Sequence, residues 1–201
     1  MRSALRLGLL CGISLLAAGL LTGCGTVFQT LPARSATEQL LISTAADRAL
    51  AGLPADLLKD KAVLVDMKNL DCYDKPYVLD RIAYEIVAKG GKRVEAADQT
   101  DIVLSLASGA LSIDKIDYLF GIPAIPLPIP TVGTPLCLPE IALFKLIKMD
   151  GKAKLLVSAV DPKTKLQAYK SELYYGRSEQ RYMWLLFTGP YKWGDLAYQV
   201  E

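Results

Sequence analysis

The chain contains no histidine among its 201 residues. Histidine is the commonest general base, the usual partner of a nucleophilic Ser or Cys, and the commonest zinc ligand. Glycine-rich phosphate loops after a strand are also missing, since Gly90-Gly91 follows a helical stripe and indicates a helix end. These absences exclude the most frequent hydrolase and zinc sites, and we expect a protein that is not an enzyme and binds no metal.

The chain also lacks an apolar run long enough for an ordinary transmembrane helix. The longest run, Leu7 to Leu21, has about 15 residues, whereas roughly 20 are needed to cross a bilayer. It follows Arg2 and Arg6 and ends at Thr22-Gly23, which is the pattern of a secretory signal peptide over residues 1–23. Without these two arginines, 21 of the 23 basic residues remain against 21 acidic ones, so the net charge of the mature chain is near zero. This charge does not favour nucleic acid as a partner.

Cysteine is sparse, and one of the four cysteines, Cys11, leaves with the signal peptide. The stretch 21–24, Leu-Thr-Gly-Cys, resembles the bacterial lipobox, in which cleavage falls before the cysteine and its sulfur carries a diacylglycerol. The resemblance implies a covalent lipid on Cys24 and no other cofactor, and several acyl chains on one residue attach a protein stably to a membrane. The residue after the cysteine is Gly25 rather than Asp, which resembles the signal that sends bacterial lipoproteins to the outer membrane. We therefore expect an anchor at its periplasmic face; the alternative is a secreted protein with a thiol at Cys24.

Two cysteines, Cys72 and Cys137, remain in a compartment that permits disulfides. A bridge between them would close a loop of about 65 residues and stabilise the fold by about 4 kcal/mol in the loop-entropy model. The alternative is two free thiols, which applies if the fold holds them beyond bonding distance. The sequence leaves both alternatives open.

The mature chain divides into a lipidated tether, 24–34, and a single periplasmic α/β domain, 35–201. Ser35 and Glu38 have the spacing of a capping box, and an apolar stripe from Ile42 to Leu53 follows at helical intervals. A strand at 61–67, a helix after Asp74 and a short strand at 93–96 predict a β-α-β start.

The last third predicts an antiparallel meander. We expect a hairpin at Asp150-Gly151, a type I turn at 161–164, and two further strands at 166–175 and 182–187. The predicted fold class is therefore α/β (α+β), a mostly antiparallel sheet with helices packed on one face, in which the β-α-β start is followed by the C-terminal meander.

A proline-rich insertion is predicted at 115–140, where six of the 11 prolines fall. Proline lacks the amide hydrogen that a central strand needs, so we expect polyproline-like chain or a loop along an edge. Apolar residues between the prolines form a candidate surface for a partner protein: Ile122, Ile125, Leu127 and Ile129. The alternative is that they cover an edge of the sheet.

Two other groups are candidates for binding. Tyr191 and Trp193 fall outside a clean strand pattern, and we expect them to contact the membrane or a ligand unless they pack in the core. Asp66, Asp71 and Asp74 cluster near the end of the first strand, where α/β sheets often place ligands. Carboxylates alone suffice for glycoside hydrolysis, so this cluster supports an alternative function in binding or hydrolysing envelope glycan.

Several stretches together resemble a family of bacterial lipoproteins of unknown function. These are the lipobox, 35–41, 108–114, 121–130 and 140–145. More distantly, the element order is similar to periplasmic domains of the curli-secretion channel lipoprotein and of lipoproteins that activate cell-wall synthases; this likeness concerns architecture only. The combined expectation is a non-enzymatic accessory or scaffold lipoprotein that binds an envelope protein in assembly or transport.

Overall fold

The computed structural model describes residues 34–127 and 136–196, with the backbone alone at positions 126, 127, 136 and 137. Residues 34–201 form one compact unit of the chain. The lipidation site predicted at Cys24, and Ile129 of the predicted partner surface, lie outside the described residues.

The helices are α2 (Ala36–Ala51), α3 (Ala55–Leu58) and α4 (Lys75–Ala88), with a short 3-10 turn, η1 (Ala97–Gln99). The strands are β1 (Ala62–Asn69), β2 (Lys92–Arg93), β3 (Ile102–Ile122), β4 (Ile125–Leu127), β5 (Leu136–Leu138), β6 (Ile141–Val160), β7 (Gln167–Leu185) and β8 (Thr188–Gly194).

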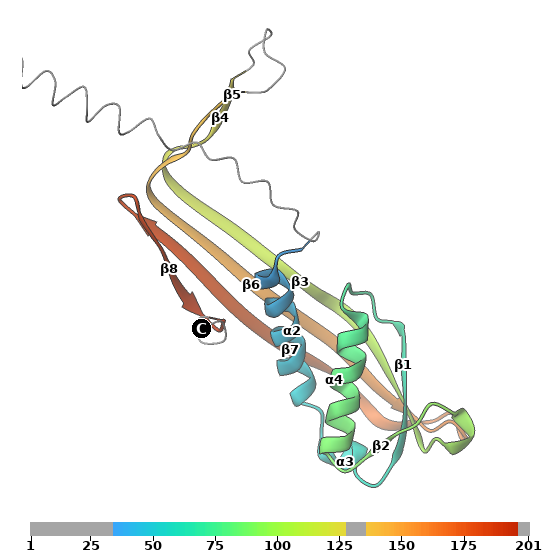
Figure 1. Ribbon diagram of the computed structural model, residues 1–201. Coiled ribbons are helices and arrows are strands. Elements are labelled where there is room, and N and C mark those ends of the chain that lie inside the picture. Colours follow the sequence, from blue (N-terminus) through green and yellow to red (C-terminus); the bar gives the residue numbers. More distant parts are fainter. Residues whose placement is uncertain (1–33, 128–135, 197–201) are drawn as a thin grey trace, which may run out of the picture. The chain divides into compact units, whose positions relative to one another are not determined.

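Six of these strands form one sheet in the order β2-β1-β3-β6-β7-β8, while β4 and β5 pair only with each other. Strand β1 is parallel to β2 and β3, and the remaining neighbours are antiparallel. Helices α2 and α4 cover one face of the sheet (Figure 1). The predicted fold class is therefore confirmed, including the β-α-β start through β1, α4 and β2.

The core lies between the helices and this face of the sheet. Helix α2 begins with the predicted capping box, in which Ser35 Oγ accepts from the Glu38 amide and Glu38 accepts from the Ser35 amide. Its apolar stripe is buried, as is that of α4, against alternate residues of β3 and β6. Central members of this core are Ala45, Leu50, Ile82, Ile86, Leu104 and Leu155.

The hairpin predicted at Asp150-Gly151 is wrong, because β6 runs unbroken through both residues. Gly151 lies under α2, where an added Cβ would come within 2.6 Å of the Leu41 carbonyl oxygen. The glycine is thus required by the close approach of a helix to the sheet rather than by a turn. The turn at Asp161 is confirmed, since its carboxylate accepts hydrogen bonds from the Lys163 and Thr164 amides.

Three further strand predictions need correction. The proline-rich insertion predicted from residue 115 begins later, because β3 continues as strand to Ile122. The strands predicted at 166–175 and 182–187 form a single strand, β7. Tyr191 and Trp193 are not outside a strand but lie in the edge strand β8. In each case, pairing with a long neighbour outweighs a local polar or proline signal.

Candidate functional site

The sheet continues past the helices at one end. Thr37, in the first turn of α2, contacts the Tyr182 hydroxyl at 3.3 Å, and the strands run on beyond this point (Figure 1). We call this part the distal sheet: residues 115–122 of β3, 141–149 of β6, 180–185 of β7, and β8. The outer part of the distal sheet therefore lies beyond α2 and α4, whereas Met149 and Tyr182 at its inner end still pack against α2.

One face of the distal sheet is almost wholly apolar, and we call it the apolar face. Strand register places its side chains in cross-strand rows, because partners in an antiparallel ladder share a face. The first row is Ile116, Lys148, Arg181 and Trp193; the second is Tyr118, Leu146, Met183 and Tyr191; the third is Phe120, Phe144, Leu185 and Thr188.

The apolar face is open to solvent to an unusual degree for side chains of this kind. Phe120 is 69% exposed, Tyr191 51% and Trp193 37%. The two cations of the first row are held in place: the Lys148 ammonium lies 5.3 Å from the Tyr118 ring centroid, and Arg181 pairs with Glu179 at 2.9 Å. In soluble proteins, large exposed apolar patches are often found at sites of interaction, so this face is a candidate binding surface.

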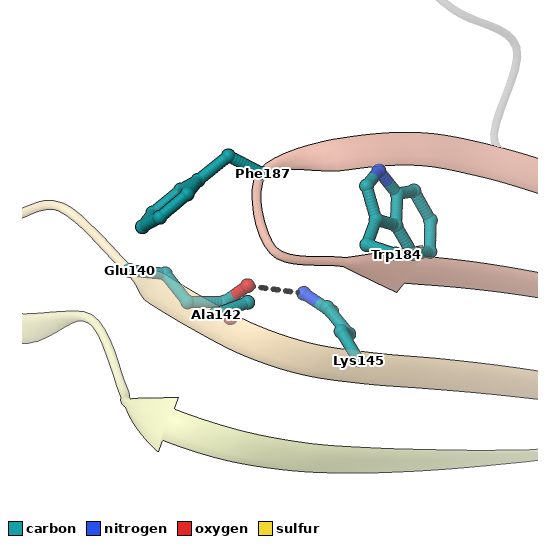
Figure 2. A pocket seen from close by; sticks show the side chains of 5 residues that line it. All are labelled: Glu140, Ala142, Lys145, Trp184 and Phe187. Atoms are coloured by element: carbon teal, nitrogen blue, oxygen red, sulfur yellow. Dashed lines mark hydrogen bonds and ion pairs between the residues drawn. The ribbon is translucent and has the colours of Figure 1, made fainter.

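The opposite face of the distal sheet carries a mixture of charges and aromatics. A hollow of about 350 Å³ is lined by Glu140, Ala142, Lys145, Trp184 and Phe187 (Figure 2). Lys145 pairs with Glu140 at 2.7 Å across it, so both charges are already satisfied. A second hollow, of about 430 Å³, separates the start of α2 from Tyr182, Trp184 and Lys192. Ser35 and Glu38, which also line the second hollow, hydrogen-bond each other in the capping box of α2.

Strands β4 and β5 form a small two-stranded sheet at the end of β3 and β6 (Figure 1), which we call the tip hairpin. Pro126 is accommodated within β4 because this narrow sheet has two edges and no central strand. Of the residues predicted to bind a partner, Ile122 is 52% exposed and Ile125 is 43% exposed. The side chain of Leu127, like Ile129, lies outside the description.

The aspartates near the end of β1 do not converge on one site. Asp66 accepts a hydrogen bond from the Lys68 amide, whereas the Asp74 carboxylate pairs with Arg34 at 2.9 Å. Asp74 occupies the N-cap position of α4 but makes no side-chain capping bond. Among the described residues, no group of three or more acidic or cysteine side chains is placed to hold a metal ion.

Cys72 is a free cysteine in the structure. Its neighbour Asp71 exchanges backbone hydrogen bonds with the Ser108 hydroxyl, whereas the backbone of Cys137 lies in the tip hairpin. Between Ser108 and Ile122, β3 rises by about 45 Å at about 3.3 Å per residue. The Cys137 side chain is not described, so the bridge stays a prediction, but a long strand separates the two backbones.

Burial is the largest of the effects that raise the pKa of the Cys72 thiol above its ordinary value, and Asp74 adds to it. The thiol is therefore protonated at neutral pH, which does not suit a nucleophile.

Tyr191 and Trp193 lie together on the apolar face, opposite Met183 and Arg181 of β7. Their contact with a membrane or a ligand stays a prediction.

Sequence reasoning missed most of the apolar face. The signal was present as strict alternation at Ile116, Tyr118 and Phe120, which is the period of a strand. The neighbouring prolines obscured this alternation, because they favour a loop over the whole segment 115–140. Joining these residues to Phe144 and Leu146 needs the register of β3 with β6, which local sequence does not supply.

Comparison with known protein families identifies the family of this chain. Residues 17–200 match the Family of unknown function (DUF6655). The protein belongs to this family. The DUF6655 match spans nearly the whole chain, and with it the candidate surfaces described above, but the family brings no activity with it. No curated protein matches the chain. Within the described part of this DUF6655 protein, no helix is long and apolar enough to span a membrane.

Proposed function

We propose that this protein is a lipid-anchored accessory protein at the periplasmic face of the outer membrane, and that its tip hairpin binds a protein partner in envelope assembly or transport. The lipobox at Cys24 supports the anchor. The observation that supports partner binding is the tip hairpin itself, which pairs with no strand of the main sheet and exposes apolar side chains.

The hairpin formed by β3 and β6 acts as a support for this surface. Its ladder runs from Val103 paired with Val160 to Ile122 paired with Ile141, with two register shifts. Long antiparallel pairing of this kind fixes the direction of the support, and β7 pairs with β6 up to Phe144. A tip held in a fixed direction loses little entropy on binding, as does the proline-rich chain within it.

Apolar exposure at the tip favours a protein partner over a soluble metabolite. Ile125 and Leu138, paired across β4 and β5, are 43% and 45% exposed. A surface without charged groups or an enclosed cavity has little with which to orient a small polar ligand. The glycan alternative gains no specific support, because Asp66 and Asp74 each have a local partner.

The test is photo-crosslinking in intact cells that produce the full chain. A photoreactive amino acid replaces Ile125 in one sample and Leu166, which is 69% exposed at the turn before β7, in the control. We expect Ile125 to label one envelope protein that Leu166 does not label. Loss of this product in the Cys24→Ser variant would show that the anchor is needed.

A paired substitution tests the same surface without a photoreactive group. Ile125→Ser combined with Leu127→Ser should abolish recovery of the partner, whereas Leu166→Ser should leave it unchanged. Circular dichroism of the purified variants checks the fold. Equal recovery from the tip variant and the wild type would refute the role of the tip hairpin, and unfolding of the variant would assign these residues to structure instead.

A further inference from the structure

We propose that the apolar face of the distal sheet lies against the lipid bilayer that holds the Cys24 anchor, with its second and third rows at the boundary between acyl chains and head groups. This inference rests on the anchor in the proposed function but not on the protein partner. It concerns the face of the main sheet, whereas the tip hairpin is a separate surface.

The first argument is the chemistry of the three rows. None contains an acidic residue. The second row contains only apolar and aromatic side chains, and the third differs from it only by Thr188 at the edge. The next row inward changes character at once, since it aligns Asp114, Asp150 and Glu179. The cations Lys148 and Arg181 belong to the first row, which lies between this acidic row and the apolar second row. Tyr and Trp beside Lys and Arg are the residues that favour the boundary between acyl chains and head groups.

The second argument is that none of the residues the structure describes covers the second and third rows of this face. The buried core lies on the other side of the sheet, under α2 and α4, and ends near Met149. The third-row residues Phe120 and Leu185 are 69% and 46% exposed. Exposed aromatic surface of this extent costs free energy in water, and contact with lipid recovers it.

The third argument is the reach of the tether. The ten residues that join Cys24 to Arg34 extend at most about 35 Å. The described chain begins on the opposite face of the distal sheet, because Ser35 lines a hollow of that face together with Lys115, Tyr182 and Lys192. From Lys115 to the end of β3 at Ile122 is a rise of about 25 Å. A lipid on Cys24 therefore reaches the level of every row, which favours its own bilayer as the occupant.

The size of the face also suits a bilayer surface. The rows from Ile116 to Phe120 span about 13 Å along the strand, so a sheet that meets the bilayer at a tilt, with Phe120 deepest, fits the depth of about 5–10 Å by which an interfacial element is immersed. The second and third rows would then enter the acyl boundary. The cations of the first row would remain among the head groups, and the acidic row would stay in water.

The chain provides its own probe pair for a test, because it contains two tryptophans on opposite faces of the distal sheet. Trp193 lies on the apolar face, and Trp184 lines both hollows of the other face. Trp184→Phe leaves Trp193 as the sole indole, and Trp193→Phe leaves Trp184. Each full-length lipidated variant is reconstituted into phosphatidylethanolamine and phosphatidylglycerol vesicles that carry brominated acyl chains, which quench indole emission on contact.

We expect loss of most of the Trp193 emission and little loss of the Trp184 emission, relative to vesicles without bromine. If the protein floats with the vesicles but neither tryptophan is quenched, the inference is refuted while the anchor stands. Equal quenching of both also refutes it, since it would not assign lipid to one face. Unquenched Trp193 together with a crosslinked dimer would show that a second copy covers the face. Failure to float would refute the anchor and the inference together.

Discussion

The α-carbon of Gly176 in β7 lies directly under the carbonyl oxygen of Ala45 in α2, so any Cβ at this glycine would overlap that oxygen. The same helix approaches Gly151 of β6 through the Leu41 carbonyl. Two neighbouring strands thus lack side chains where one helix crosses them. This close packing fixes the position of α2 on the sheet, and with it the length of sheet that remains uncovered.

The first prediction concerns this contact. Gly176→Ala should lower the free energy of unfolding by about 3 kcal/mol, because neither backbone can move without disturbing the core. Urea unfolding of the purified protein measures it. Gly109→Ala is the matched control, since its Cβ would meet only the flexible Lys154 side chain at 3.1 Å, and we expect a change within about 0.5 kcal/mol. Equal stability of the two variants would contradict the role of Gly176.

The second prediction concerns Asp195, which accepts hydrogen bonds from the Arg48 guanidinium at 2.8 and 2.9 Å and from the Glu179 amide at 2.8 Å. The bond from Arg48 is the main reason why the pKa of Asp195 lies below its ordinary value. Because the folded state lowers this pKa, the stabilisation is present above the unfolded-state pKa and is lost as the pH falls through the folded-state pKa.

Asp195→Asn should therefore cost about 1 kcal/mol at neutral pH, since Arg48 is half exposed and solvent screens the pair. The difference from wild type should shrink at a pH well below the ordinary aspartate pKa of about 3.9, because the wild-type carboxylate, whose folded-state pKa is lower still, is protonated there as well. Chemical unfolding at the two pH values provides the measurement. Asp98→Asn, at an exposed acid in η1, is the control and should change stability at neither pH. A pH-independent cost would indicate a packing defect instead.

The third prediction concerns the Cys72 thiol. Alkylation without reductant should modify Cys72, because the fold separates it from the backbone of Cys137 by most of the length of β3. Burial raises its pKa, so the rate should keep rising at pH values above those where an ordinary thiol has reached its maximum. A short cysteine peptide provides the reference rate. Mass spectrometry that finds a peptide pair linked through Cys72 and Cys137 would refute this expectation.

The fourth prediction concerns the point where the tether ends and α2 begins. Ser35→Ala removes the Oγ that accepts from the Glu38 amide, and should lower stability by about 1 kcal/mol. Ser43→Ala is the control, because its hydroxyl donates only to the Leu40 carbonyl within the same helix. Thermal unfolding of both variants gives the comparison. An equal effect of the two substitutions would mean that the capping box does not matter for stability.

The helical part of the fold was predictable from sequence because its signals are local. The capping box at Ser35, the stripe of α2 and the β-α-β order each depend on residues within one or two turns or on a single strand. The strand boundaries were less predictable. A Gly after an Asp indicates a hairpin locally, yet Gly151 lies in mid-strand because a helix 110 residues earlier in the chain packs on it.

The sequence by itself determined the fold class and the start of α2, and it predicts the lipid anchor at Cys24. Each of these depends on a short-range pattern of residues. Only the tertiary structure decided that the segment before Ile122 is strand, that Tyr191 and Trp193 share a face with Phe120, and that the described residues leave this face exposed. The physical reason is register: the pairing of β3, β6, β7 and β8 brings together side chains that are up to about 80 residues apart.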